Sequence, residues 1–218
     1  ELGCGTGRLT VPLARAGVRI HGIDRSGPML SRLAARLERL PPLVRDQISF
    51  AEADYLSPEA TPPADMGAPA AVLWPFNALH HCPGPDAVAA VLRKAGEWVG
   101  GGGRLAVDCY LPDRELYSRD PDQRYEFRTF VDPSDGGMLE SWEQGWWDEE
   151  NRVHHVVYTY RSGDGRERRS HLSLRMYELA ELHALIAASG WRIVREVRDF
   201  DGTPLGPRPL KWIAVLER

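Results

Sequence analysis

The first 110 residues alternate between short apolar runs and segments with helical spacing. Met29, Leu30, Leu33 and Leu37 recur every three or four positions, which is the spacing of one helix face. The apolar runs with the length and composition of buried strands are residues 18–24, 48–54, 70–76 and 104–110. Strands that alternate with helices predict a parallel sheet with helices on both faces, the doubly wound α/β fold.

The pattern changes after Tyr110. From about residue 125 to residue 176, polar and apolar residues alternate between turn signals, which predicts three or four antiparallel strands. A helix at 179–189 follows, and then two strands at 191–200 and 210–217. The antiparallel segment therefore interrupts the α/β pattern just before the last helix.

A chain of 218 residues suits one domain. We expect a single domain over 1–218, in which residues 1–112 and 177–218 form the α/β core and residues 125–176 form an antiparallel β insertion. The insertion is expected to lie on the acceptor side of the site or to form a dimer contact.

Charge and composition exclude several classes of partner. There are 27 basic and 31 acidic residues, so the basic excess typical of nucleic-acid binding is absent. No apolar run approaches the roughly 20 residues that span a bilayer, so we expect no membrane partner. Three cysteines without C-x-x-C spacing favour a reducing cytoplasm. The run His80-His81-Cys82 lacks the spacing that places ligands on one helix face, so no metal is expected.

Glycine occupies every second position at the start of the chain, as Gly3, Gly5 and Gly7 in "ELGCGTG". Without a Cβ, such a turn lets the backbone pass within contact distance of a ligand. It stands between a strand end and a helix, where doubly wound sheets bind nucleotides. Arg8 replaces the last glycine of the dinucleotide pattern G-x-G-x-x-G, which disfavours an NAD(P)-dependent oxidoreductase but leaves it as an alternative.

The glycine turn and the following "GIDRSGPML" (22–30) resemble the first two motifs of class I S-adenosylmethionine-dependent methyltransferases. The resemblance continues in "AEAD" (51–54), "PFNALHH" (75–81) and "GGGGRLAVD" (100–108), and so covers the whole chain. The insertion and the tail are similar to a bacterial group of small-molecule methyltransferases of this class. The fold implied is a Rossmann-like sheet whose first strand is truncated, because only Glu1-Leu2 of it remain. We expect several tens of residues before Glu1, comprising most of that strand and a helix over the cofactor.

The resemblance implies S-adenosylmethionine as cofactor and S-adenosylhomocysteine as product. It implies that the glycines approach the methionine portion and the ribose, that Asp24 accepts hydrogen bonds from the ribose hydroxyls, and that Asp54 accepts one from the adenine amino group. The implied cofactor-binding residues are Glu1, Gly3, Cys4, Gly5, Gly7, Asp24, Arg25, Met29, Asp54, Tyr55, Trp74 and Asn77.

Methyl transfer from a sulfonium is an in-line displacement in which alignment can supply about 7–11 kcal/mol, so a general base is not essential. If there is one, His80 and His81 are the best placed, and Tyr177 is a further candidate that would face the acceptor. The alternative for both histidines is a role in capping or packing the segment after the fourth strand.

Aromatic residues of the insertion are candidates for an acceptor-binding wall: Trp142, Trp146, Trp147, Tyr158 and Tyr160. They could equally form the buried face of a sheet or a homodimer contact. The function expected is methyl transfer to nitrogen or oxygen of a small molecule. Besides the oxidoreductase, the alternative is a non-catalytic domain that binds cofactor for regulation.

Overall fold

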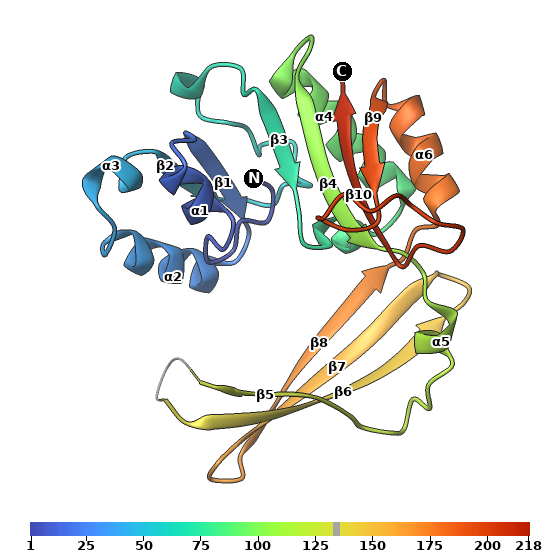
Figure 1. Cartoon of the computed structure of the whole chain (residues 1–218). Helices are drawn as coiled ribbons and strands as arrows, with labels where there is room; N and C mark the ends of the chain where they lie inside the picture. The colour runs from blue at the N-terminus through green and yellow to red at the C-terminus, as the bar shows by residue number, and fades with distance from the viewer. Residues whose placement is uncertain (133–135) are drawn as a thin grey trace. The chain divides into compact units, whose positions relative to one another are not determined.

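The computed structural model describes residues 1–132 and 136–218 (Figure 1). Two compact units make up the chain: residues 1–110 with 179–218, and residues 111–178. Residues 133–135 fall within the predicted insertion and lie outside the described residues. Across the described ranges, none of the helices has both the length and the apolar character needed to cross a bilayer.

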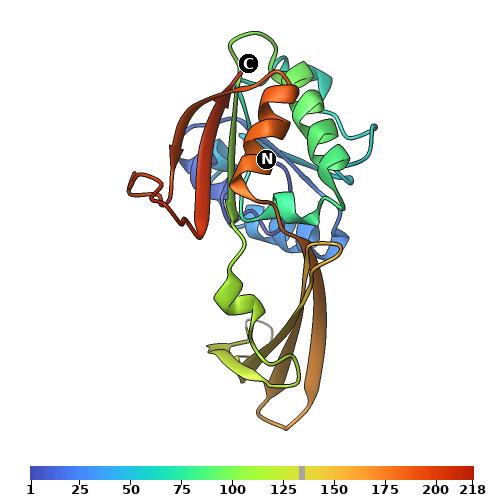
Figure 2. The same cartoon turned by 90° about the vertical axis from the view of Figure 1, so that its right-hand side faces the viewer.

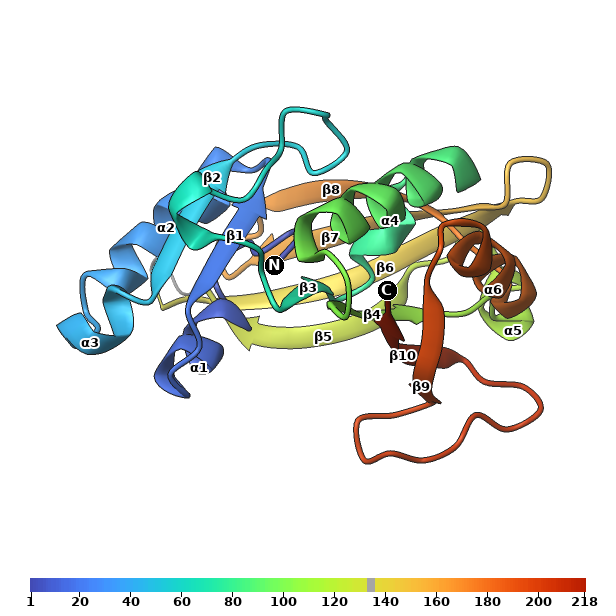
Figure 3. The same cartoon turned by 90° about the horizontal axis from the view of Figure 1, so that it is seen from above.

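Strands of the first unit form two sheets, one of two strands and one of four. Their bounds are β1 (Ile20–Asp24), β2 (Ile48–Glu52), β3 (Ala71–Trp74), β4 (Arg104–Tyr110), β9 (Arg192–Val197) and β10 (Lys211–Glu217). β1 pairs with β2 in parallel, and the larger sheet has the order β3-β4-β10-β9. β3 and β4 are parallel, whereas β10 is antiparallel to both of its neighbours (Figure 1). Figure 3 shows the same strands from above. The predicted α/β class with a parallel start is confirmed.

Residues Glu1 and Leu2 lie between the two sheets. The Leu2 N–H donates to the Leu73 oxygen at 2.8 Å, and Leu2 also forms a parallel bridge with Ile23 of β1. The Ile23 N–H in turn donates to the Glu1 oxygen at 2.9 Å. This segment therefore delivers the glycine turn to the carboxyl ends of β1 and β3.

The helices follow the apolar spacing of the sequence. Those of the first unit are α1 (Thr10–Arg15), α2 (Gly27–Leu37), α3 (Pro42–Arg45), α4 (Pro85–Val99) and α6 (Leu179–Ala188), with 3-10 turns η1 (Ala64–Met66) and η2 (Ala78–His81). The face of α2 that carries Leu30, Leu33 and Leu37 is buried, as its spacing predicts. α4 and α6 pack side by side (Figure 2). The short helices α3, η1 and η2 have too few residues for a periodic signal and were not predicted.

One core cluster packs β3 and β10 against α4 and α6. Trp74 of β3 and Trp212 of β10 are fully buried, beside Leu182 of α6. Trp191, just after α6, donates its indole N–H to the Leu92 oxygen of α4 at 2.8 Å. A buried indole that keeps a hydrogen-bond partner avoids the cost of an unmade bond.

In its described residues, the second unit is an antiparallel sheet with one short helix. Its elements are α5 (Arg114–Tyr117), β5 (Tyr125–Val131), β6 (Met138–Asp148), β7 (Val153–Ser162) and β8 (Glu167–Arg175), in the sheet order β5-β6-β7-β8. The five aromatic residues proposed as a wall do not share one face. Side chains alternate along a strand, and the register places Trp142 and Trp146 on one face and Trp147, Tyr158 and Tyr160 on the other. A single wall of all five is therefore wrong.

Candidate cofactor site

The glycine turn has the backbone conformation that its sequence predicts. Gly3, Gly5 and Gly7 have φ angles of 71°, 54° and 74°, in the left-handed region that favours glycine. The Gly3 and Cys4 N–H groups donate to the Ile23 oxygen at 2.7 and 3.1 Å, which fixes the turn on the end of β1. The turn is therefore held by the strand beside it.

The three glycines are needed for different reasons. A Cβ on Gly7 would lie 2.5 Å from Leu33 Cδ1, so the absence of a side chain allows α2 to pack against the turn. A Cβ on Gly3 or Gly5 would make only ordinary contacts, at 3.6 Å from Ala78 Cβ and from Met29 Cε respectively. Gly7 thus serves helix packing, whereas Gly3 and Gly5 leave open backbone for a ligand.

Asp24 ends β1 directly beside the turn. Its Oδ2 accepts the Gly5 N–H at 2.7 Å and its Oδ1 accepts the Ser26 N–H at 2.8 Å. An ionised carboxylate has about four acceptor positions, so each oxygen retains one for a further donor. Two fixed acceptors side by side suit a vicinal diol such as the ribose 2′ and 3′ hydroxyls.

Glu1 and Cys4 contact the protein itself. The Glu1 carboxylate accepts the Thr10 hydroxyl at 2.5 Å at the start of α1, and burial raises the pKa of this carboxyl. The Cys4 side chain lies in the core cluster with Val11 and Leu33, and burial raises the pKa of its thiol to about 12. Only the backbone of Cys4 can therefore face a ligand, whereas Glu1 supports the turn.

A second polar group follows β2. Asp54 Oδ1 accepts the Leu56 N–H at 2.9 Å, and Asp54 Oδ2 lies 4.0 Å from Arg25 Nη1. Among the described residues, the Tyr55 N–H has no hydrogen-bond acceptor. An acceptor at Asp54 and a donor at Tyr55 match the amino group and the ring nitrogen on the Watson–Crick edge of adenine. Met29 is partly exposed beside Gly5.

The Tyr55 side chain points inward. Its hydroxyl donates to the Ala78 oxygen at 2.7 Å, and its ring meets Trp74 edge-on at 6.1 Å between centroids. Burial raises the pKa of the Tyr55 hydroxyl. The side chains of Tyr55 and Trp74 are therefore part of the packing beneath the site.

A strained turn follows β3, and its partners were missed by the sequence analysis. Phe76 and Asn77 have φ angles of 57° and 61°, which non-glycine residues rarely adopt. The Phe76 N–H donates to Asp108 Oδ1 at 3.0 Å, and the Asn77 N–H donates to the Asp108 backbone oxygen at 3.2 Å. Asn77 Oδ1 accepts the Tyr110 N–H at 2.7 Å. The end of β4 thus holds the turn after β3.

Asp108 and Arg8 join this turn to the rest of the site. Asp108 is buried, and desolvation raises the pKa of its carboxyl. The Arg8 guanidinium, one residue past the glycine turn, lies 4.1 Å from the centroid of the Phe76 ring. A signal for Asp108 was present, since it is an acidic residue near the end of a predicted strand, like Asp24. Nothing in the sequence pairs Arg8 with Phe76.

The three catalytic candidates differ in their surroundings. His80 is buried with Nε2 3.0 Å from the Tyr110 oxygen, and because a carbonyl only accepts, this nitrogen carries the proton. His81 is exposed, and partial burial of its ring lowers its pKa. Tyr177 is buried in the second unit, with the Arg175 guanidinium 4.4 Å from its ring centroid. A catalytic role for each stays a prediction.

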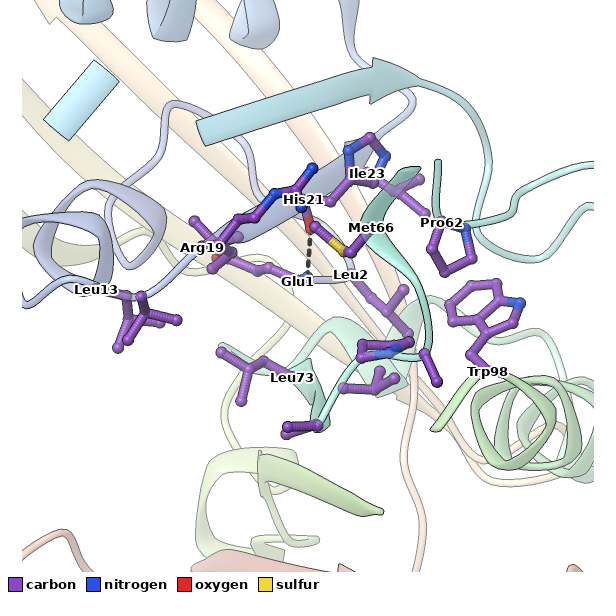
Figure 4. A pocket seen from close by; sticks show the side chains of 17 residues that line it. Glu1, Leu2, Leu13, Arg19, His21, Ile23, Pro62, Met66, Leu73 and Trp98 are labelled. Atoms are coloured by element: carbon purple, nitrogen blue, oxygen red, sulfur yellow. Dashed lines mark hydrogen bonds between the residues drawn. The ribbon is translucent and has the colours of Figure 1, made fainter. Parts of the chain in front are cut away.

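A cavity of about 390 Å³ lies elsewhere in the first unit. Figure 4 shows its lining, which is mostly apolar and includes Met66 and Trp98 together with the polar residues Glu1, Arg19 and His21. Apart from Glu1, none of the predicted cofactor residues lines this cavity. The candidate site is therefore the carboxyl edge of β1 to β4, where the glycine turn, Asp24 and Asp54 come together, and not this hollow.

Comparisons with known proteins show similarity to methyltransferases. Residues 1–105 match the family described as "Methyltransferase domain". The CcbJ methyltransferase from Streptomyces caelestis is 24% identical with a TM-score of 0.82, covering 100% of this chain and 81% of that one. S-adenosylmethionine-bound CalS10 from Micromonospora echinaspora, an amino pentose methyltransferase, is 17% identical with a TM-score of 0.70, covering 100% of this chain and 81% of that one.

The sugar N-methyltransferase KedS8 from Streptoalloteichus sp. is 16% identical with a TM-score of 0.70, covering 100% of this chain and 78% of that one. No curated protein matches the sequence significantly. The fold is that of class I methyltransferases. Residues 1–105 match the methyltransferase-domain family, and over the whole chain the fold is similar to that of these solved methyltransferases. This result favours the methyltransferase prediction over the dinucleotide oxidoreductase.

Proposed function

We propose that this chain is an S-adenosylmethionine-dependent methyltransferase that acts on nitrogen or oxygen of a small molecule, with an amine on a sugar-like acceptor as the first choice. The support for the site is the pairing of the Gly5 N–H with Asp24, which fixes an open glycine backbone beside two carboxylate acceptors. The choice of acceptor is supported by the structural neighbours of the chain, which include an amino pentose methyltransferase and a sugar N-methyltransferase. The acidic net charge of −4 disfavours a nucleic-acid acceptor.

The residues of the edge fit the cofactor. Gly3 and Gly5 present backbone without side chains, Asp24 offers acceptors for the ribose hydroxyls, and the Asp54–Tyr55 pair matches the adenine edge. When bound, S-adenosylmethionine supplies a methyl group on a positively charged sulfur. The contribution of the chain is then to hold that group in line with the acceptor, and such alignment can supply about 7–11 kcal/mol.

A proton must leave an amine acceptor at some stage. His81 is exposed and partial burial of its ring lowers its pKa, so the neutral imidazole, which can accept a proton, prevails near pH 7. Asp108 is another titratable group at this edge, but its Oδ1 already accepts the Phe76 N–H. We therefore propose His81 ahead of His80 as a proton acceptor.

We also propose action in the cytoplasm, because an odd number of cysteines gives no disulfide framework.

Two assays test the proposal. Calorimetry with S-adenosylhomocysteine is expected to show micromolar binding, with no response to NADH. Release of S-adenosylhomocysteine is then measured against matched acceptors, namely amino sugars, the corresponding hydroxyl sugars, simple amines and phenols. Turnover confined to amino sugars supports the proposal. Binding without turnover of any acceptor would instead support a regulatory cofactor-binding domain, and binding of NADH alone would overturn the site assignment.

A further inference from the structure

Lys94 on α4 contacts the loop that follows β2. The chain has only two lysines, Lys94 and Lys211, among 27 basic residues, so arginine is the usual cation of this protein. Lys94 Nζ lies 2.6 Å from the Tyr55 oxygen and 2.6 Å from the Ser57 oxygen. A lysine at this position thus binds two backbone carbonyls of one short loop.

Two carbonyls and one aromatic ring surround the Lys94 ammonium. Two of its N–H donors point to the carbonyls, and the Trp98 ring lies on another side with its centroid 5.6 Å from Nζ. An ammonium is compact and tetrahedral, so it can reach two convergent carbonyls where a planar guanidinium needs more room. Burial lowers the pKa of Lys94, while nearby Asp54, Glu59 and Glu97 oppose that shift. The ammonium is therefore partly desolvated, and its hydrogen bonds to the two carbonyls replace hydrogen bonds to water.

The tethered loop carries the groups that match adenine. Tyr55 is held at its carbonyl by Lys94 and at its hydroxyl by the Ala78 oxygen, 2.7 Å away. Asp54 Oδ1 is held by the Leu56 N–H. Asp54 Oδ2, which lies 4.0 Å from Arg25 Nη1, is then the carboxylate oxygen that can face a base together with the Tyr55 N–H. With Tyr55 fixed on two sides, the spacing between this acceptor and this donor is set by the protein before ligand binding.

We propose that Lys94 is a positioning residue for base recognition: its two carbonyl contacts hold the Asp54–Tyr55 loop in the geometry that selects adenine. The inference rests on the proposed cofactor site and adds a specificity determinant to it. Lys94 does not touch the cofactor; it acts through the backbone of Tyr55 and Ser57.

The test compares two ligands that differ only in the base. S-adenosylhomocysteine presents an amino donor and a ring-nitrogen acceptor, whereas S-inosylhomocysteine presents a carbonyl acceptor and an N–H donor at the same positions. Dissociation constants for both are measured by calorimetry on the wild-type chain and on Lys94→Met, Lys94→Arg and Lys211→Met. The control Lys211 lies on β10, with Nζ 4.1 Å from the Phe200 ring centroid.

Lys94→Met is expected to weaken binding of S-adenosylhomocysteine about tenfold, as expected for lost charge-assisted hydrogen bonds. Binding of the inosine analogue should change much less, so the preference for adenine falls. Lys94→Arg keeps the charge and the fold, and should lower the preference by a smaller factor. Lys211→Met should keep the wild-type preference. A merely structural role for Lys94 would lower thermal stability without changing the ratio of the two constants.

The outcomes separate this inference from the proposed function. If the wild-type chain binds neither ligand, the cofactor site itself is wrong. If it binds S-adenosylhomocysteine with a preference for adenine that Lys94→Arg and any folded Lys94→Met retain within twofold, the inference about Lys94 is overturned and the site stands. A wild-type chain that binds both ligands equally would also overturn it.

Discussion

Two turns of the candidate site adopt left-handed backbone by different means. The turn after Leu2 uses glycine at all three left-handed positions, so its conformation costs little. The turn after β3 places Phe76 and Asn77 in that region, at a cost of about 1–3 kcal/mol each. The second turn persists because Asp108 and Tyr110 of β4 supply its hydrogen-bond partners. One turn is encoded locally, and the other is imposed by the neighbouring strand.

Of the substitutions in the two turns, that of Gly7 should cause the largest loss in the free energy of unfolding. Gly7→Ala places a Cβ 2.5 Å from Leu33 Cδ1 at a φ of 74°, so unfolding by urea should show a loss of about 2–4 kcal/mol. The matched control is Gly17→Ala, which has a φ of 86° and open space around the new Cβ. Its loss should be about 1–2 kcal/mol, from the backbone alone. Equal losses in the two variants would contradict the packing role of Gly7.

Removal of the Asp108 carboxylate should have the next largest effect. Asp108→Ala leaves the Phe76 N–H without its acceptor and should reduce the free energy of unfolding by about 1–3 kcal/mol. Asp108→Asn keeps an acceptor oxygen and should lose much less. If the alanine and asparagine variants are equally stable, the strained turn does not depend on this hydrogen bond.

The same residue predicts a pH dependence. Burial raises the pKa of Asp108 above its unfolded value of 3.8. Both states are protonated below that value. As pH rises through it, the unfolded state ionises first, so stability is lost between 3.8 and the raised pKa of the native state. The stability of the wild type minus that of Asp108→Asn should therefore fall across this window and then stay constant. A difference that rises with pH would show that the native carboxylate is stabilised instead.

The contact between the two turns should give the smallest effect. Arg8→Gln removes the guanidinium that lies 4.1 Å from the Phe76 ring centroid, and should cost about 0.5–1 kcal/mol. Arg15→Gln is a suitable control, since this arginine is exposed at the end of α1. Thermal melts of both variants check the prediction. An identical melting midpoint in the two variants would show that the contact of Arg8 with Phe76 does not stabilise the protein.

The same contrast explains what could be predicted from the sequence. Glycine spacing, strand alternation and the leucine face of α2 act locally, so they predicted the turn, the parallel strand pairing of the first 110 residues and the position of Asp24. The turn at Phe76 depends on β4, which lies some thirty residues further along the chain, and no local pattern pairs them. Cys4 and Trp74 were predicted to bind the cofactor, and the structure buries the side chains of both in the core, because a motif fixes the backbone and not the direction of each side chain.

The central claim is that Asp24, held by the glycine turn, binds the cofactor ribose. The direct measurement is calorimetry of S-adenosylhomocysteine with the wild type and with Asp24→Asn, which replaces one acceptor oxygen by a donor amide. Asp46→Asn, at an exposed acid after α3, is the control. We predict at least about a tenfold loss of affinity for Asp24→Asn, as expected for lost hydrogen bonds to a charged group. Unchanged affinity in a folded Asp24→Asn variant would contradict the account.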